Sequence, residues 1–267
     1  MSTSIDVDLA FAIAAARDAG HRLAGLRATE RWEGKTLGDV GDQAADGFLR
    51  GLLEGRYPED GVLSEETKDS PERLQHSRVW VVDPLDGTKE YRAVRKDWAV
   101  HVALTIDKKV VLGAVALPSL DSVLWGVCGD DPRAGVEGTL QSMTRGDSES
   151  PAKPRVAVSR SHTPPWVEKF TETMGGEMLR WGSVGFKVSR LLTGEADLYV
   201  HKVGLKEWDT CAPEAVARAL GWHVCKLRGE EHTYNRPDPK NHELVICRPQ
   251  MKDKVLEAIA SCGALED

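Results

Sequence analysis

The sequence lacks the long apolar run that a membrane-spanning helix requires. None of its hydrophobic stretches reaches the ~18 residues needed to cross a bilayer. Residues 1–20 also lack a basic leader and carry acidic residues within their apolar part, which is not the pattern of a secretory signal. We therefore predict a protein without membrane association.

Paired cysteines and clusters of basic residues are missing as well. The five cysteines include no C-x-x-C pair, so neither a zinc site nor a disulfide framework is indicated, and we predict a reducing, cytoplasmic location. The formal net charge is −7, and no basic cluster marks a nucleic-acid surface. With 267 residues, of which 41% are apolar, the chain has the length and composition of a globular protein with a large core. A phosphorylated small molecule held through a metal remains compatible with the negative charge.

The most informative stretch is a short apolar run, residues 79–82, that ends abruptly in the sequence DPLDGT. Pro84 removes a backbone N–H group, and Gly87 permits the tight turn that follows. The turn brings the carboxylates of Asp83 and Asp86 into one small space, with a carbonyl between them. Such an oxygen set suits Mg²⁺, which takes one or two carboxylates and keeps waters for substrate phosphate. Taken alone, however, two acidic residues in a Pro/Gly turn are explained equally well as turn chemistry.

Hydrophobic periodicity predicts the elements of the first part of the chain. Helical spacing covers residues 6–27 and resumes from about Asp42. Strands are predicted at residues 61–66, 79–82, 98–106, 110–117 and 122–128, of which the last three indicate an antiparallel meander. The polar residues 67–77 are expected to be exposed. Residues 129–154, rich in Gly, Ser, Asp and Pro, are the best candidate for a boundary.

Strands and helices alternate beyond that boundary. Strands are predicted at residues 155–158, 177–180, 197–200, 223–227 and 244–247, and helices at 164–174, 184–192, 208–220 and 250–261. Such alternation favours a mixed α/β arrangement in layers. We therefore predict an N-terminal α+β half, residues 1–150, and a C-terminal α/β half, residues 151–267, joined in one compact unit.

Four acidic positions stand out along the chain: Asp42, Glu65, the Asp83/Asp86 pair and Asp209. Strand ends and helix starts carry most of them, and backbone geometry can aim such side chains at one point. Asp42 and Asp209 are also explained as helix caps, because a carboxylate satisfies the unpaired N–H groups of a first turn. Glu65 alone is also explained as a solvated surface residue.

The segments LSEE, WVVDPLDGTKEY, SRSH, GSVGFK, GEADLY and EWDTCAPE occur in an order that resembles the metal-dependent, lithium-sensitive phosphatases. This superfamily includes the inositol monophosphatases and fructose-1,6-bisphosphatases, and within it the sequence is most similar to the 3′(2′),5′-bisphosphate nucleotidases. The resemblance covers about residues 42–220. It implies a layered α-β-α-β-α sandwich in two halves, with the site between them.

The resemblance implies a site for two or three Mg²⁺ ions and inhibition by Li⁺. The implied metal ligands are Glu65, Asp83, the carbonyl of Leu85, Asp86 and Asp209. Asp42 and Thr88 are the implied catalytic pair, which orients and deprotonates the attacking water. The chemistry is consistent, because a metal lowers the pKa of its bound water. Thr88, a poor base itself, relays a proton only if a carboxylate such as Asp42 accepts from it.

The resemblance also implies substrate contacts, at Gly87, Thr88, Ser159, Arg160, His162, Ser183, Lys187, His201 and Asp209. Ser159 and His162 match positions that touch adenosine, and Ser183 and Lys187 match positions near the nucleotide's phosphate and ribose. Arg160 is an additional candidate phosphate contact. The alternatives are a polar turn after a strand for the first segment and a solvated lysine for the second.

His201 stands where inositol monophosphatases have a glutamate that holds the sugar ring, which argues against inositol. Asp39 stands where the family has threonine, and it either adds charge near the metals or is simply exposed. Residues 129–154 and 230–241 carry no motif that we can assign.

The function that these resemblances imply is Mg²⁺-dependent hydrolysis of 3′-phosphoadenosine 5′-phosphate to AMP and phosphate, in sulfate assimilation. The 5′-phosphosulfate form is a further candidate substrate. The partner is a small phosphorylated nucleotide, and the protein is expected to be a monomer or homodimer. The alternatives are an inositol monophosphatase or fructose-1,6-bisphosphatase activity, alone or as broad specificity, and a non-catalytic nucleotide or metal sensor on the same fold.

Overall fold

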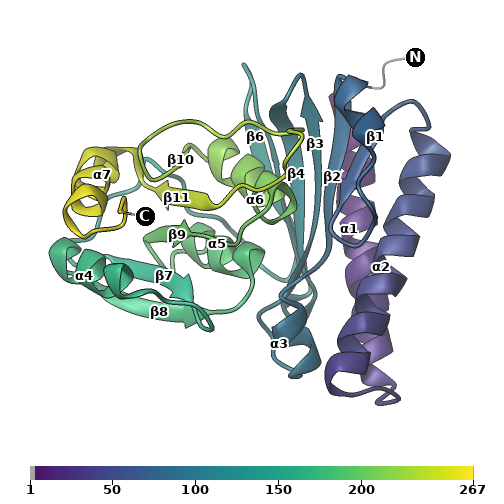
Figure 1. Cartoon of the computed structure of the whole chain (residues 1–267), viewed down its shortest axis with the longest axis horizontal. Coiled ribbons are helices and arrows are strands. Elements are labelled where there is room, and N and C mark those ends of the chain that lie inside the picture. The colour runs from purple at the N-terminus through teal and green to yellow at the C-terminus, as the bar shows by residue number, and fades with distance from the viewer. Residues whose placement is uncertain (1–3, 267) are drawn as a thin grey trace.

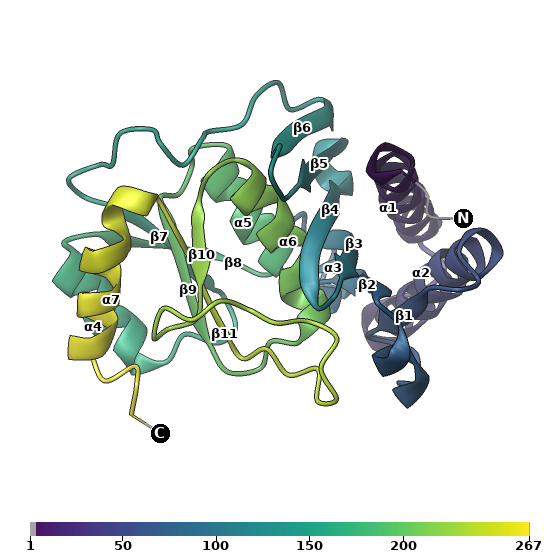
Figure 2. The same ribbon diagram turned by 90° about the horizontal axis from the view of Figure 1, so that it is seen from above.

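Residues 4–266 are described by a computed structural model, in which helices and sheets alternate in five layers (Figures 1 and 2). One outer layer consists of α1 (Ile5–Ala28) and α2 (Gly34–Arg56). A six-stranded sheet follows, then a central layer of α5 (Val184–Leu192) and α6 (Glu207–Ala219), then a five-stranded sheet. The second outer layer consists of α4 (Pro165–Met174) and α7 (Lys252–Ser261). The predicted α-β-α-β-α sandwich is thus confirmed.

The first sheet has the strand order β1-β2-β3-β4-β5-β6. Its strands are β1 (Gly61–Ser64), β2 (Arg78–Asp86), β3 (Ala99–Ile106), β4 (Lys109–Leu117), β5 (Ser122–Val127) and β6 (Arg133–Gly138). β1 and β2 are parallel, and every later pair is antiparallel, so the predicted meander is present. β6 lies within residues 129–154, where no strand was predicted because the segment is rich in Gly, Ser, Asp and Pro.

The second sheet has the order β10-β11-β9-β7-β8 and mixes parallel with antiparallel pairs. Its strands are β7 (Arg155–Ser159), β8 (Glu177–Trp181), β9 (Leu198–Lys202), β10 (His223–Cys225) and β11 (Glu243–Cys247). Both sheets are covered on both faces by helices, which explains their largely apolar strands. None of the described helices is long and apolar enough to cross a membrane.

Helix α2 begins eight residues earlier than predicted, at Gly34, so Asp42 lies inside the helix and does not cap it. The glycines before Asp42 resemble a loop in the sequence, but they serve close packing. A Cβ atom at Gly41 would lie 2.9 Å from the Tyr91 ring, and one at Gly38 would lie 3.0 Å from the Thr88 methyl group. The glycines therefore let α2 approach α3 (Thr88–Arg92), which follows β2 directly.

Residues 67–77 are not uniformly exposed, which corrects the prediction for this segment. They include a short 3-10 helix, Pro71–Gln75, in which Arg73 is only 2% exposed. Long-range hydrogen bonds hold this arginine inside the protein.

The two sheets share the central helix layer, because α6 packs directly on β4 and β5. Two glycines permit the contact. A Cβ atom at Gly113 would lie 2.7 Å from both the Cα atom and the carbonyl oxygen of Ala212, and one at Gly126 would lie 2.7 Å from the Cα atom of Val216. The predicted division at residue 150 stays a prediction, but α6 binds the later part of the chain tightly to the first sheet.

Replacing Gly113 by alanine tests this contact. The new methyl group has no room against the α6 backbone, so we expect Gly113→Ala to lower the free energy of unfolding by about 1–3 kcal/mol. Gly47→Ala in α2 is the matched control, since nothing lies within 4 Å of its Cβ position. We expect that control to be neutral or to stabilise by up to about 1 kcal/mol. Urea denaturation of both variants measures the difference, and equal stabilities would contradict the packing described.

Candidate active site

Strand β2 delivers the first two candidate ligands. Apart from Arg78, its residues are all buried, and its pairing with β3 shifts register between Asp83 and Asp86, around Pro84. The N–H group of Leu85 donates to a carboxylate oxygen of Asp83 at 3.0 Å. Gly87 then adopts a left-handed conformation with φ of 91°, which glycine permits without strain. The tight turn predicted from the sequence is therefore present.

Three carboxylates converge at the end of β2. One oxygen from each of Asp83, Asp86 and Asp209 lies within 4.8 Å of the others. Asp209 comes from the first turn of α6, where it accepts the N–H group of Lys206 at 2.6 Å, so it caps the helix while it faces the cluster. Carboxylates at such spacing repel one another. This set of oxygen donors suits a hard divalent cation.

Burial and this repulsion together raise the pKa values of most acids in the cluster. Burial, followed by Glu65 and Asp86, raises the pKa of Asp83 well above its usual range. Burial, followed by Asp86, raises the pKa of Asp209 to about 7, and burial, followed by Asp209, raises that of Glu65 to about 8. The side chain of Glu65 is exposed and that of Asp209 is partly exposed, yet the protein around both carboxyl groups is dense enough to desolvate their charges. Glu65, directly after β1, thus belongs electrostatically to the same cluster.

Asp86 differs from its neighbours because donors surround it. Its carboxylate accepts from the Ser183 hydroxyl at 2.6 Å and from the N–H groups of Val184 and Gly185 at 3.1 and 2.7 Å. His101 Nε2 lies 3.1 Å away. Burial favours the protonated form, but His101, Ser183 and Lys187 outweigh it and lower the pKa of Asp86 to about 2. His101 is not among the residues predicted from the sequence, although a histidine inside an apolar strand is a signal of such a role.

Asp42 and Thr88 meet at the side of this cluster. The Thr88 hydroxyl lies 3.3 Å from Asp42 Oδ1 and 3.2 Å from the carbonyl oxygen of Leu85, so its single proton is shared between two acceptors. Asp42 is 8% exposed. Burial, followed by the charge of Glu66, raises the pKa of Asp42 to about 7, while the hydrogen bond from Thr88 opposes the shift.

Three of the predicted substrate contacts line one small cavity, namely Ser159, His162 and His201. The Ser159 hydroxyl accepts the N–H group of His162 at 3.2 Å. His201 contacts the Tyr199 hydroxyl through Nδ1 at 2.9 Å and the carbonyl of Val203 through Nε2 at 3.0 Å. Burial, followed by the charge of Lys187, lowers the pKa of His201 to about 3, so this histidine is neutral.

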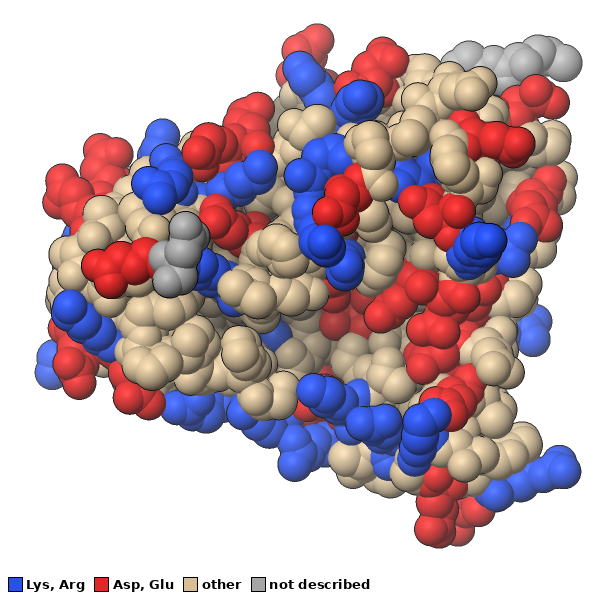
Figure 3. Space-filling view, in the orientation of Figure 1, with Lys and Arg blue, Asp and Glu red and all other residues tan. Residues whose placement is uncertain are grey.

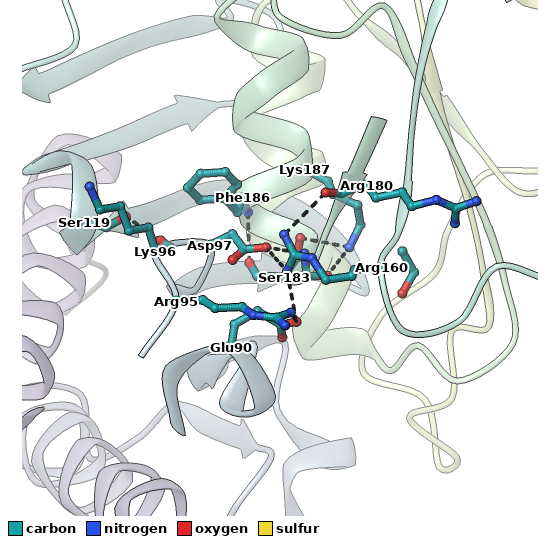
Figure 4. Close-up of polar contacts among 12 residues, drawn as sticks. Glu90, Arg95, Lys96, Asp97, Ser119, Arg160, Arg180, Ser183, Phe186 and Lys187 are labelled. Atoms are coloured by element: carbon teal, nitrogen blue, oxygen red, sulfur yellow. Dashed lines mark hydrogen bonds and ion pairs between the residues drawn. The ribbon is translucent and has the colours of Figure 1, made fainter. Parts of the chain in front are cut away.

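Arg160 and Lys187 are held by protein groups (Figure 4). Arg160 Nη1 donates to Asp97 at 2.5 Å and to Glu90 at 3.4 Å, so its role as a phosphate contact stays a prediction. Lys187 is 1% exposed, and its ammonium group donates to the carbonyls of Gly182 and Ser183. A solvated lysine is therefore the wrong explanation for Lys187. Burial lowers its pKa to about 8, against the raising effect of Asp86.

Charge of opposite sign gathers next to the acidic cluster. On the face shown in Figure 3, acidic side chains line the upper and right-hand sides of a central hollow, and basic side chains follow its lower edge over α3. A hollow of about 560 Å³ beside α3 is lined by Gly34, Lys35, Lys89, Glu90, Arg92, Ala93, Arg95, Arg160 and Ser161. Lys35 pairs with Asp39 at 2.6 Å, which places the unusual Asp39 in a surface ion pair. Among the described residues, no carboxylate lies within ion-pair distance of Lys89 or Arg92.

Known proteins resemble this chain along most of its length. It is 37% identical over 256 residues to the 3′-phosphoadenosine 5′-phosphate phosphatase of Mycobacterium bovis, which covers 91% of this chain and 90% of that protein. It is 33% identical over 196 residues to the Golgi-resident adenosine 3′,5′-bisphosphate 3′-phosphatase of Homo sapiens, covering 70% and 52% of the two chains.

Solved structures share the fold. CysQ from Bacteroides thetaiotaomicron, a bacterial member of the inositol monophosphatase family, aligns with a TM-score of 0.76 and 25% identity over 91% of this chain and 98% of that one. Inositol monophosphatase II from Staphylococcus aureus aligns with a TM-score of 0.81 and 20% identity over 96% and 95%, which shows the fold alone. The model of the inositol monophosphatase family matches residues 3–264, and the chain therefore belongs to this family.

Proposed function

We propose that this phosphoric monoester hydrolase removes the 3′-phosphate of 3′-phosphoadenosine 5′-phosphate and releases AMP and phosphate. The observation that carries the proposal is the convergence of Asp83, Asp86 and Asp209 beside the Asp42–Thr88 pair. The names of the curated relatives support the substrate. A role in sulfate assimilation and a cytoplasmic location belong to the same proposal.

The metal in this proposal is Mg²⁺, held by Glu65, Asp83, the carbonyl of Leu85, Asp86 and Asp209. The donor set is all oxygen, and four of its five members are carboxyl groups that ionise when they bind a cation, which fits a hard metal ion. When bound, Mg²⁺ supplies a water of lowered pKa and stabilises the charge on the phosphoryl oxygens. Inhibition by Li⁺ is part of the proposal.

Asp42 and Thr88 handle the proton of the attacking water. The hydroxyl of Thr88 is within reach of both Asp42 and the Leu85 carbonyl. With the Leu85 carbonyl held by the metal, the Thr88 hydroxyl would donate to Asp42 alone. Thr88 would then take the proton of the attacking water while its own hydroxyl proton passes to Asp42. A pKa of about 7 suits Asp42 to this task, because a base works best near the operating pH. No covalent intermediate is required, since phosphoryl transfer depends mostly on positioning and charge stabilisation.

The basic hollow beside α3 supports a substrate with two phosphates. Its cations Lys89 and Arg92 follow Thr88 in the chain, and Arg160 and Ser161 on its other side follow Ser159. A ligand whose first phosphate meets the acidic cluster through metal can therefore place a second phosphate against positive charge. Inositol monophosphate has no second phosphate, and the neutral His201 provides no acidic group to hold a sugar ring.

A panel of three substrates tests the proposed specificity. We expect kcat/KM for 3′-phosphoadenosine 5′-phosphate to exceed the values for inositol 1-phosphate and fructose 1,6-bisphosphate by at least about tenfold, or 1.4 kcal/mol in transition-state binding. Phosphate release and identification of AMP measure the outcome. A higher kcat/KM for inositol 1-phosphate would refute the substrate assignment.

Variants of the basic hollow test the second-phosphate contact. We expect the double variant Lys89→Gln/Arg92→Gln to lose about tenfold in kcat/KM on 3′-phosphoadenosine 5′-phosphate, because charge-assisted contacts to phosphate disappear. Hydrolysis of adenosine 3′-monophosphate, which lacks the second phosphate, should change less than about twofold. Lys254→Gln on the exposed face of α7 is a control for charge. Equal losses on both substrates would show that the hollow does not bind the second phosphate.

Variants of the catalytic pair test the proton relay. Asp42→Asn and Thr88→Ala should each lower kcat by about 10²–10⁴-fold, the usual contribution of general base catalysis. Thr88→Ser keeps the hydroxyl and should retain most activity, which separates the relay from loss of packing. Calorimetry should find Mg²⁺ binding largely unchanged in all three variants. Normal turnover in Thr88→Ala would remove the relay from the mechanism.

The raised proton affinities predict how metal binding depends on pH. Glu65 and Asp209, with pKa values of about 8 and 7, are largely protonated at pH 6 and largely ionised at pH 8.5. Protons therefore compete with Mg²⁺ at the lower pH and not at the higher. We expect saturating Mg²⁺ to raise Tm more at pH 8.5 than at pH 6, as measured by scanning calorimetry. Asp209→Asn should reduce the shift at both values, and a larger shift at pH 6 would contradict the assignment.

A further inference from the structure

Residues 232–236, which carry no motif in the sequence, are fixed to helix α6 next to a candidate metal ligand. Glu207 lies two residues before Asp209 and is completely buried. Its two carboxylate oxygens accept the backbone N–H groups of Asn235 at 2.6 Å and Arg236 at 3.0 Å. Both oxygens of the Glu207 carboxylate are therefore engaged in hydrogen bonds to this segment.

The same segment is hydrogen-bonded to the part of the chain that follows Glu65. Arg73, at 2% exposure, donates from Nη1 to the side-chain oxygen of Asn235 at 2.7 Å and from Nη2 to the carbonyl of Arg236 at 2.9 Å. The side-chain nitrogen of Asn235 returns a bond to the carbonyl of Arg73 at 3.1 Å. The guanidinium group also binds both carboxylate oxygens of Asp69, at 2.5 and 2.8 Å.

A second anchor fixes the segment two turns further along α6. Glu214, at 2% exposure, contacts His232 Nδ1 at 2.5 Å and accepts from the Tyr234 hydroxyl at 2.8 Å. Asn235, whose N–H group binds Glu207, adopts a φ of 50°. This is a left-handed conformation that asparagine tolerates better than most residues. This conformation lets one residue engage Glu207 through its backbone and Arg73 through its side chain.

The polypeptide backbone and these hydrogen bonds together connect Glu65 with Asp209. The connection runs from Glu65 along eight residues to Arg73, across Asn235 to Glu207, and along α6 to Asp209. Glu65 and Asp209 repel each other when both are ionised, which is the state that binds a cation, so contacts elsewhere must hold their segments together. Mg²⁺ demands near-ideal octahedral geometry, and small errors in ligand spacing therefore weaken its binding.

We propose that Arg73, Asn235 and Glu207 are positioning residues that set the spacing of Glu65 and Asp209 for metal binding. The inference rests on the metal site of the proposed function. None of the three residues is proposed to touch metal or substrate, and they act only through the segments that they join. We call these three residues the spacing clamp.

The decisive variant is Asn235→Ala, which breaks both side-chain bonds to Arg73. We expect isothermal titration calorimetry, without substrate, to show at least about a tenfold weaker Kd for Mn²⁺ or Mg²⁺. At saturating Mg²⁺, kcat should stay within about threefold of the unmodified protein, because the catalytic pair is untouched. Arg73→Lys provides an independent variant, since a single ammonium group cannot span Asp69, Asn235 and Arg236 at once.

Tyr234→Phe is the matched control. Tyr234 lies in the same segment as Asn235, and its hydroxyl is hydrogen-bonded to Glu214 and Thr210 of α6. The variant removes these buried contacts and leaves the contacts to Arg73 and Glu207 in place. We expect a loss of Tm comparable to that of Asn235→Ala, with an unchanged metal Kd. An unchanged metal Kd in Asn235→Ala, or an equal weakening in Tyr234→Phe, would overturn the spacing clamp. The calorimetric result stands whichever phosphate ester the enzyme hydrolyses, so a failure of the substrate assignment is recognised separately.

Discussion

Repulsion between buried carboxylates is the constraint on which this structure depends. Asp83, Asp86 and Asp209 meet within 4.8 Å, and the raised pKa values of Asp83, Asp209 and Glu65 show that the protein does not neutralise the cluster by itself. Such an arrangement persists only when the surrounding structure holds it in place. The rigidity of β2, the first turn of α6 and the donors around Asp86 provide that support. In the proposed function, a divalent cation would relieve the repulsion between these acids.

The support comes from elements that are far apart in the sequence. Asp86 binds the start of α5 through Ser183 and Gly185, so the first sheet and the central helix layer meet at a candidate ligand. Asn235 likewise joins the segment after Glu65 to α6. Hydrogen bonds thus tie the first-sheet part of the acidic site to both central helices, which restricts how far its candidate ligands can separate.

The strands, the helices and the turn that holds Asp83 and Asp86 were predictable from the sequence, because they depend on local patterns. The five-layer arrangement, and Glu65 and Asp209 as further members of the acidic site, were implied by the resemblance to a known family. Strand and helix periodicity follow from neighbouring residues, and Asp83 and Asp86 lie in one turn. The interior position of Asp42 was not predictable from that pattern. Gly38 and Gly41 look like loop residues in the sequence. In the structure they lie in α2, where the absence of a side chain lets α3 pack closely. The burial of Arg73 likewise depends on a partner that is distant in the chain, Asn235, and such pairing leaves no local pattern.

The packing of α6 on the first sheet also affects how the chain folds during synthesis. Strands β1 to β6 are complete by Gly138, but the face that Gly113 and Gly126 present stays uncovered until residues 207–219 have been made. At a synthesis rate of about 5–20 residues per second, that interval lasts several seconds. An apolar sheet face is prone to association while it is exposed, so this interval is the part of synthesis in which the first sheet is least protected.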